Sequence, residues 1–181
     1  IKFITSERTI WENISMDSFS KSHSHTLEIT MDIKNLEKIA NNLVSPGKGI
    51  LAADESNGTM SKRLESVGIE PTEENRRKYR VNLFSSKNYE KAISGVILYD
   101  ETIRQKMDNG VDIPTALKER GIYPGIKVDT GTKELEGSFG EKITEGLDGL
   151  SERCKEYFEM GARFSKWRAV ISIDEDNPSE R

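Results

Sequence analysis

Charged residues stand at alternate positions inside the short apolar segments of this sequence. Lys127 and Asp129 are two positions apart in one segment, and Lys166 and Arg168 are two positions apart in another. Asp54 closes a third segment. Because alternate side chains of a β-strand point to the same face, each strand would send its charges to one side. The sequence therefore predicts acids and bases on one face of a sheet, towards the ends of its strands.

Such a set of charges can serve two kinds of chemistry. Burying an unpaired charge is costly, so these groups must pair or face a wet cavity. Lysine and arginine interleaved with acids suit a phosphorylated, anionic substrate. They also suit carbonyl chemistry, in which a lysine amine attacks the carbonyl carbon and forms an imine. Structural salt bridges across a solvated face are the alternative, but α/β proteins place active sites at the carboxyl ends of their strands.

A loop with hydroxyl groups and a glycine follows the first apolar segment. Its residues, Asp54–Thr59, could present backbone N–H groups and hydroxyls to a phosphate. The same residue types are typical of an ordinary strand-to-helix turn with an N-cap. The loop alone does not decide between the two interpretations.

The segments that must position these residues alternate between strand and helix patterns. Short apolar runs bounded by turn residues predict four strands: Gly49–Ala53, Ile93–Tyr99, Gly125–Asp129 and Phe164–Ile171. Strands separated by helices indicate βαβ units and a parallel sheet. Four of them fit a small open sheet, and they equally fit half of a (β/α)8 barrel.

Helices are predicted from apolar spacing and from capping residues. The three- and four-residue spacing predicts a helix over Ile33–Leu43. Thr72 is expected to cap a second helix, Pro114–Arg120 to form a third and Asp148 to cap a fourth. The apolar face of the fourth would consist of Leu150, Cys154, Tyr157 and Phe158, with Gly161 just past its end.

The composition of the 181 residues excludes several classes of protein. There are 31 acidic and 27 basic side chains, a net charge of -4, which is too mild and too mixed for a nucleic-acid-binding surface. No stretch approaches the ~20 consecutive apolar residues of a membrane span. One cysteine cannot form an internal disulfide framework. We therefore predict neither nucleic acid nor a membrane among the partners.

The first part of the chain has no pattern of a folded domain. Residues 1–30 are polar, and we predict a leader or disordered extension there, followed by a folded region over residues 31–181. His23 and His25 could bind a metal ion, but no set of carboxylate or thiol ligands accompanies them. We predict no metal and no cofactor.

Several long segments together resemble the class I fructose-1,6-bisphosphate aldolases. They occur in the order of that family over residues 33 to about 173. The segments are Lys48–Ser56, Gly95–Leu98, Gly125–Asp129, Gly146–Cys154 and Lys166–Arg168.

The resemblance implies a (β/α)8 TIM barrel of the class I aldolase type. The implied reaction is the reversible cleavage of fructose 1,6-bisphosphate to dihydroxyacetone phosphate and glyceraldehyde 3-phosphate. It proceeds through a lysine Schiff base, without metal. A cytoplasmic location and a homotetramer for the full-length protein are implied as well.

The family's site residues carry over by position. Asp54 would orient substrate hydroxyls and assist proton transfer, and Lys166 would lie beside the imine, where its charge lowers the pKa of the Schiff-base lysine. Arg168 would lie near a substrate phosphate. The other implied binding residues are on the phosphate side of the sugar: Ser56, Thr59 (where the family commonly has serine), Lys62, Arg63 and Lys127.

The resemblance covers only about the first four β/α units of such a barrel. The family has its Schiff-base lysine in the sixth strand and acid/base glutamates in the fifth, and neither motif occurs here. We therefore expect a fragment that corresponds to the N-terminal half of the barrel and that is inactive alone. In a second interpretation, Lys166 or Lys127 forms the imine itself. In a third, the chain is a non-catalytic binding or assembly module.

Overall fold

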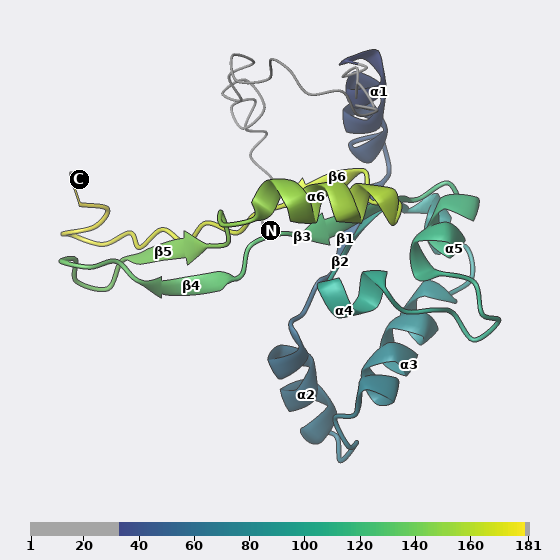
Figure 1. Cartoon of the computed structure of the whole chain (residues 1–181), viewed down its shortest axis with the longest axis horizontal. Helices are drawn as coiled ribbons and strands as arrows, with labels where there is room; N and C mark the ends of the chain where they lie inside the picture. The colour runs from purple at the N-terminus through teal and green to yellow at the C-terminus, as the bar shows by residue number, and fades with distance from the viewer. Residues whose placement is uncertain (1–32, 180–181) are drawn as a thin grey trace, which may run out of the picture. The chain divides into compact units, whose positions relative to one another are not determined.

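A four-stranded, entirely parallel sheet organises the part of the chain that the structure describes. The structure is a computed structural model that describes residues 33–179. The sheet has the order β1-β2-β3-β6 (Figure 1), with β1 (Gly49–Ala53), β2 (Ile93–Leu98), β3 (Tyr123–Lys127) and β6 (Phe164–Lys166). The four predicted strands and their parallel pairing are confirmed, but β3 begins and ends two residues before the predicted Gly125–Asp129, so Asp129 lies beyond the strand. The prediction of a polar leader over residues 1–30, with His23 and His25, lies outside the described residues.

Three of the predicted helices begin and end close to their expected positions. They are α1 (Ile33–Leu43), α3 (Glu73–Phe84) and α5 (Ile113–Glu119). The Thr72 hydroxyl accepts a hydrogen bond from the Asn75 backbone N–H at 3.1 Å, which confirms the predicted N-cap of α3. Acidic Glu73 and Glu74 follow in its first turn, where the helix dipole favours negative charge.

The fourth predicted helix, α6 (Leu150–Glu159), begins differently from the prediction. Its N-cap is Gly149 rather than Asp148, and Gly149 has a φ of +64°, a conformation that suits glycine best. Phe158 was expected on the apolar face but is 53% exposed, and its ring lies 4.4 Å from the Arg163 guanidinium. The buried side of α6 is built around Tyr157.

The extent of α2 (Asn57–Glu65) was not predicted, although a strand-to-helix turn was one interpretation of the loop before it. A 3-10 turn, η2 (Tyr89–Lys91), the single turn α4 (Asp100–Ile103) and a hairpin were not predicted at all. The hairpin pairs β4 (Gly131–Glu134) with β5 (Lys142–Glu145) in antiparallel register. Its strands have no apolar run, and cross-strand ion pairs join Lys133 to Glu145 and Lys142 to Glu134. A pattern of apolar residues therefore could not reveal it.

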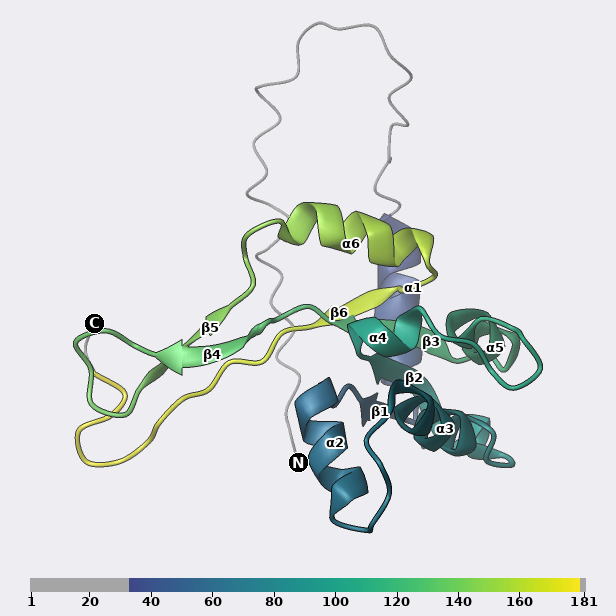
Figure 2. The same cartoon turned by 60° about the horizontal axis from the view of Figure 1, so that its bottom comes forward.

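The hairpin extends away from the four-stranded sheet and is accompanied by the chain after β6 (Figures 1 and 2). The Thr144 hydroxyl donates to the Arg168 carbonyl at 2.7 Å, and the Ser172 hydroxyl donates to the Gly140 carbonyl at 2.9 Å. These contacts explain why β6 ends at Lys166 instead of continuing to Ile171 as predicted. Beyond Lys166 the chain no longer pairs with β3 in the sheet, and it runs along the hairpin instead.

The two faces of the sheet are packed differently. On the outer face, Ala53, Leu98 and Ile126 form one row across three strands and are buried against the helices. This core includes Val81, Phe84, Ile103, Ile113, Leu117 and Tyr157. On the inner face, the Phe164 ring lies over Gly125 so closely that a Cβ there would overlap it. The inner face is thus filled towards the beginnings of the strands, and its charged residues lie at the other end.

Candidate functional site

Three charged residues predicted from strand alternation share one row at the carboxyl ends of the strands. Lys127 and Lys166 are paired in register on β3 and β6. Ala53 lies in the same row as Ile126 across the sheet. Asp54, one residue beyond Ala53, therefore falls in the row of Lys127 and Lys166 and on the same inner face.

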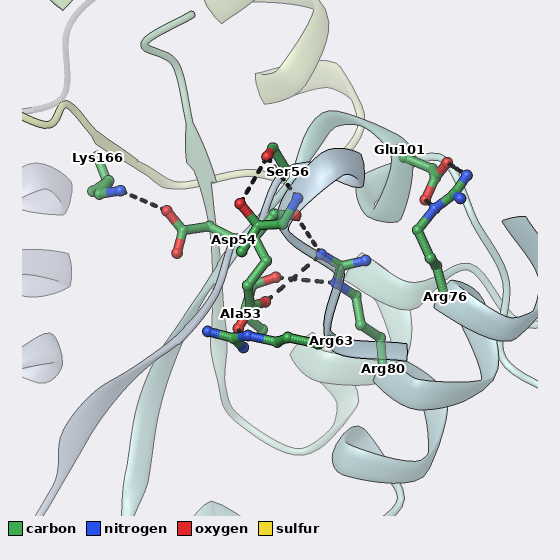
Figure 3. A network of polar contacts seen from close by, with 10 residues as sticks. Ala53, Asp54, Ser56, Arg63, Arg76, Arg80, Glu101 and Lys166 are labelled. Carbon is green, nitrogen blue, oxygen red and sulfur yellow. Dashed lines mark hydrogen bonds and ion pairs between the residues drawn. The ribbon is translucent and has the colours of Figure 1, made fainter. Parts of the chain in front are cut away.

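The carboxylate of Asp54 and the ammonium of Lys166 form a close ion pair (Figure 3). The Nζ–Oδ2 distance is 2.6 Å, and the side chains of Lys166 and Asp54 are only 19% and 14% exposed. Their strands, β1 and β6, are the first and last of the sheet. In a flat sheet about 14 Å would separate such strands, because neighbours lie about 4.8 Å apart. The contact is favoured by a sheet that curves towards this face, which makes the inner face concave.

A second ion pair lies on β3 and just beyond it. Lys127 Nζ is 2.7 Å from Asp129 Oδ1 and also donates to the Asp129 carbonyl at 2.6 Å. The Asp129 side chain is only 2% exposed, and its other carboxylate oxygen accepts the Arg168 backbone N–H at 3.2 Å. Arg168 itself is exposed, so its guanidinium is available to solvent. The predicted charges thus form two ion pairs, and Arg168 is an exposed arginine beside them.

The hydroxyl loop after β1 is the N-terminus of α2. The Ser56 hydroxyl is the N-cap: it accepts the Thr59 backbone N–H at 3.4 Å and lies 3.1 Å from the Thr59 hydroxyl. Arg63 forms an ion pair with Glu55, whereas Lys62 is exposed on α2. The structure therefore confirms the interpretation of the loop as a turn and cap. A helix N-terminus that attracts anions is still present at this place.

One residue of the site was missed by the sequence analysis. Arg80 on α3 is fully buried, and it donates to the Ala53 carbonyl from Nε at 3.2 Å and to the Glu55 carbonyl from Nη2 at 2.6 Å. Burial lowers the pKa of Arg80, and the negative charge of Glu55 opposes that effect. Its position four residues before buried Phe84, on the same side of the helix, was the available signal.

A neighbouring ion pair joins the helices around the site. Arg76 forms two hydrogen bonds with Glu101, from Nε at 2.8 Å and from Nη2 at 2.6 Å. Asn57 donates to the same carboxylate at 3.0 Å. The hydrogen bond to Glu101 raises the pKa of Arg76. These contacts hold the beginning of α2 against α3 and α4; Figure 3 shows the Arg76–Glu101 pair.

Other features of the described residues lie away from this row of charges. A shallow polar hollow is found at the opposite, amino-terminal ends of the strands; it is lined by Asn42, Ser45, Lys48, Ser94, Gly121 and Tyr123. Within residues 33–179 no group of three or more His, Cys, Asp or Glu is placed to hold a metal ion. No helix in that range has the length and apolar character needed to cross a membrane.

Comparison with known proteins gives one consistent family. The family model of the glycolytic class I fructose-bisphosphate aldolases matches residues 35–181. Fructose-bisphosphate aldolase C of Carassius auratus is 51% identical over 160 residues, which are 88% of this chain and 44% of that protein. Fructose-bisphosphate aldolase 1 of Toxoplasma gondii is 56% identical over 149 residues, which are 82% of this chain and 41% of that protein.

A solved structure agrees with these relatives. It is the fructose-bisphosphate aldolase from Plasmodium falciparum in complex with TRAP and a small-molecule inhibitor, which matches with a TM-score of 0.78 and 49% identity. The match covers 81% of this chain and 43% of that one. The chain therefore spans less than half the length of the relatives it matches.

Proposed function

Because this chain belongs to the class I fructose-bisphosphate aldolase family, we propose that it forms part of a site that cleaves fructose 1,6-bisphosphate reversibly. The products would be dihydroxyacetone phosphate and glyceraldehyde 3-phosphate. The predicted family and fold are confirmed: the four parallel strands and their helices are part of the α/β barrel of this family. The site is the concave, charged end of that sheet.

The contact between Asp54 and Lys166 carries the proposal. The two residues are assigned the catalytic roles, with Asp54 orienting substrate hydroxyls and assisting proton transfer. Lys166 would place a positive charge beside the imine. Their separation of 2.6 Å, at the carboxyl ends of strands and with little exposure, supports a joint role in one reaction. Two structural residues could form such a pair anywhere on the surface, but these meet on a concave inner face.

The remaining predicted residues are assigned to the phosphates of the substrate. Lys127 lies in the same row as the catalytic pair. Arg168 and Lys62 are exposed and able to meet an anion. Ser56 and Thr59 place hydroxyls at the N-terminus of α2, where the helix dipole favours negative charge. The assignment of Arg63 is the least direct, because Glu55 already binds its guanidinium.

Neither site lysine is assigned as the nucleophile. Lys127 and Lys166 are each held by a carboxylate, so each would have to leave its partner before its nitrogen could reach a carbonyl carbon. The imine is therefore assigned to a lysine on a later strand of the family's barrel. We propose that the 181 residues alone bind the substrate without cleaving it.

Titration of the chain with fructose 1,6-bisphosphate tests the proposal. We expect binding by the unmodified chain and about a tenfold loss of affinity for Lys127→Met, because a charge-assisted contact to phosphate is removed. Lys142→Met is the matched control, since it removes the same charge from the exposed hairpin. Equal affinities for both variants, or no binding at all, would contradict the proposal.

Borohydride trapping in the presence of the substrate tests the assignment of the imine. We expect peptide mapping to find no adduct on Lys127 or Lys166. A reduced adduct on Lys166 would transfer the nucleophilic role to this residue and would show that the pair with Asp54 opens during the reaction.

For the full-length protein we propose a cytoplasmic homotetramer. Large apolar side chains are exposed on and beside the hairpin, Phe139, Ile143 and Leu147 among them, and they support association with further chains. A chain that associates but binds no sugar bisphosphate would instead favour the alternative of a non-catalytic assembly module.

A further inference from the structure

The backbone around Asp54 lies beyond the support of the sheet. The last residue of β1 in register with β2 is Ala53, opposite Leu98. Asp54 and Glu55 therefore belong to the turn between β1 and α2. A side chain on such a turn would be poorly placed unless another element held the turn.

Arg80 holds this turn on both sides of Asp54. Its Nε donates to the carbonyl of Ala53, and its Nη2 donates to the carbonyl of Glu55 (Figure 3). The two acceptors are the carbonyl oxygens of the residues immediately before and after Asp54 in the chain. The rigid, planar fork of a guanidinium is suited to two such acceptors at once, whereas a lysine ammonium is a single point.

Arg80 is buried, so its guanidinium depends on partners from the protein and not on water. The side chain is 0% exposed, and its ion-pair partner is the Glu55 carboxylate at 3.7 Å, while Glu101 acts on it from farther away. Nη1 has no hydrogen-bond partner among the residues that the structure describes. A buried charge is normally paired as fully as possible. Here the guanidinium is oriented towards the two carbonyls instead, at the expense of a better ion pair.

We propose that Arg80 is a positioning residue, which fixes the carbonyls on both sides of Asp54 and thereby holds the Asp54 carboxylate where Lys166 reaches it. Its meaning for catalysis rests on the function proposed above. The coupling between Arg80 and the Asp54–Lys166 pair is a property of the chain without substrate.

Chemical modification of lysines measures this coupling. The folded chain is treated briefly with an amine reagent, and the rate at each lysine is obtained by mass spectrometry. In Arg80→Lys, one of the two carbonyl contacts is lost, so Asp54 is held less firmly against Lys166. We therefore expect Lys166 to react about fivefold faster, which corresponds to the release of a partly exposed ion pair. The rate at Lys127, whose partner Asp129 is local, should stay unchanged.

Arg76→Lys is the matched control. Arg76 lies one helical turn earlier on α3 and is also largely buried, but its partner is Glu101. We expect this variant to leave the rate at Lys166 as it is, with circular dichroism and thermal melting confirming the fold of both variants. An unchanged rate at Lys166 in folded Arg80→Lys, or an equal rise at Lys127, would overturn the inference.

A measurement on the unmodified chain covers the case in which Arg80→Lys does not fold. Exchange of the Arg80 Nε–H with solvent and modification of Lys166 are followed in urea below the unfolding transition. If Arg80 positions Asp54, both become accessible in the same local opening, with the same dependence on urea. Modification of Lys166 in a separate, easier opening would contradict the inference. Neither experiment uses a substrate, so failure of the proposed function and failure of this inference are separate results.

Discussion

Several polar side chains in the interior find their partners on other elements, and Tyr157 is one of them. The Tyr157 hydroxyl on α6 donates to Asp100 on α4 at 2.9 Å, although the two residues are 57 positions apart. Burial, and then the hydrogen bond to Asp100, raises the pKa of Tyr157 above its ordinary value. Such a bond contributes to stability only while the hydroxyl keeps its proton.

Replacement of this tyrosine gives a prediction with a defined pH dependence. Tyr157→Phe should lower the free energy of unfolding by about 1 kcal/mol at pH 8, because Asp100 loses a donor. The raised pKa means that the folded state holds the proton more tightly than the unfolded state. The contribution of Tyr157 is therefore complete below the ordinary tyrosine pKa of about 10 and is lost as the pH rises beyond it.

Urea unfolding at pH 8 and pH 11 measures the effect. The deficit of Tyr157→Phe relative to the unmodified chain should shrink at the higher pH. Tyr79→Phe, at a 43% exposed position, serves as the control and should change little. A deficit that grows with pH would contradict the prediction.

At the scale of elements, β6 can pack against β3 because Gly125 has no side chain. The Phe164 ring lies over Gly125 and close to Gly95, where Leu43 of α1 also arrives. Helix α1, the glycines of β2 and β3 and the aromatic ring of β6 therefore pack as one group. This group fills the inner face below the charged row.

Adding a methyl group at Gly125 should disturb that packing. We expect Gly125→Ala to destabilise the fold by about 1–3 kcal/mol, the usual effect of overpacking. Gly58→Ala is the control, because Gly58 lies in α2 with open space around its Cα, and alanine there should stabilise by about 0.5–1 kcal/mol. Urea midpoints compare the two. Rescue of Gly125→Ala by Phe164→Leu would identify the ring as the source of strain, whereas equal stability of both alanine variants would refute it.

At the scale of the whole described region, the sheet has two strands with one neighbour each. Within residues 33–179, β1 pairs only with β2, and β6 pairs only with β3. Unpaired strand edges invite pairing with another chain. Curvature moves these two edges towards each other, as the contact between Asp54 and Lys166 indicates.

We therefore predict that the 181-residue chain associates with itself as its concentration rises. Ala52→Lys should reduce this association, because a charge on an exposed position of an edge strand opposes pairing. Ala92→Lys places the same charge at an exposed position outside the strands. Sedimentation velocity over a range of concentrations distinguishes them. A monomer at all concentrations, or equal association of both variants, would be the contrary result.

What the sequence could predict follows from what its patterns encode. Apolar runs located the four strands, and strand alternation brought Lys127, Lys166 and Asp54 to one face. Neither pattern encodes the curvature of the sheet. The sequence therefore could not predict that Asp54 pairs with Lys166 and not with a residue on a nearer strand. The hairpin was invisible because its strands are charged. Arg80 was missed because a buried arginine in a polar helix looks like a surface residue until its partners are known.

The two ion pairs of the site differ greatly in the length of chain between their partners. Lys127 and Asp129 are separated by two positions, and Asp54 and Lys166 by 112. During synthesis, the first pair can form as soon as β3 emerges, whereas the second must wait until all four strands exist. Long-range contacts of this kind form late in folding. A ribosome-bound chain would thus hold Asp54 without its partner until β6 arrives, and the closing of this pair would signal that β6 has joined the sheet.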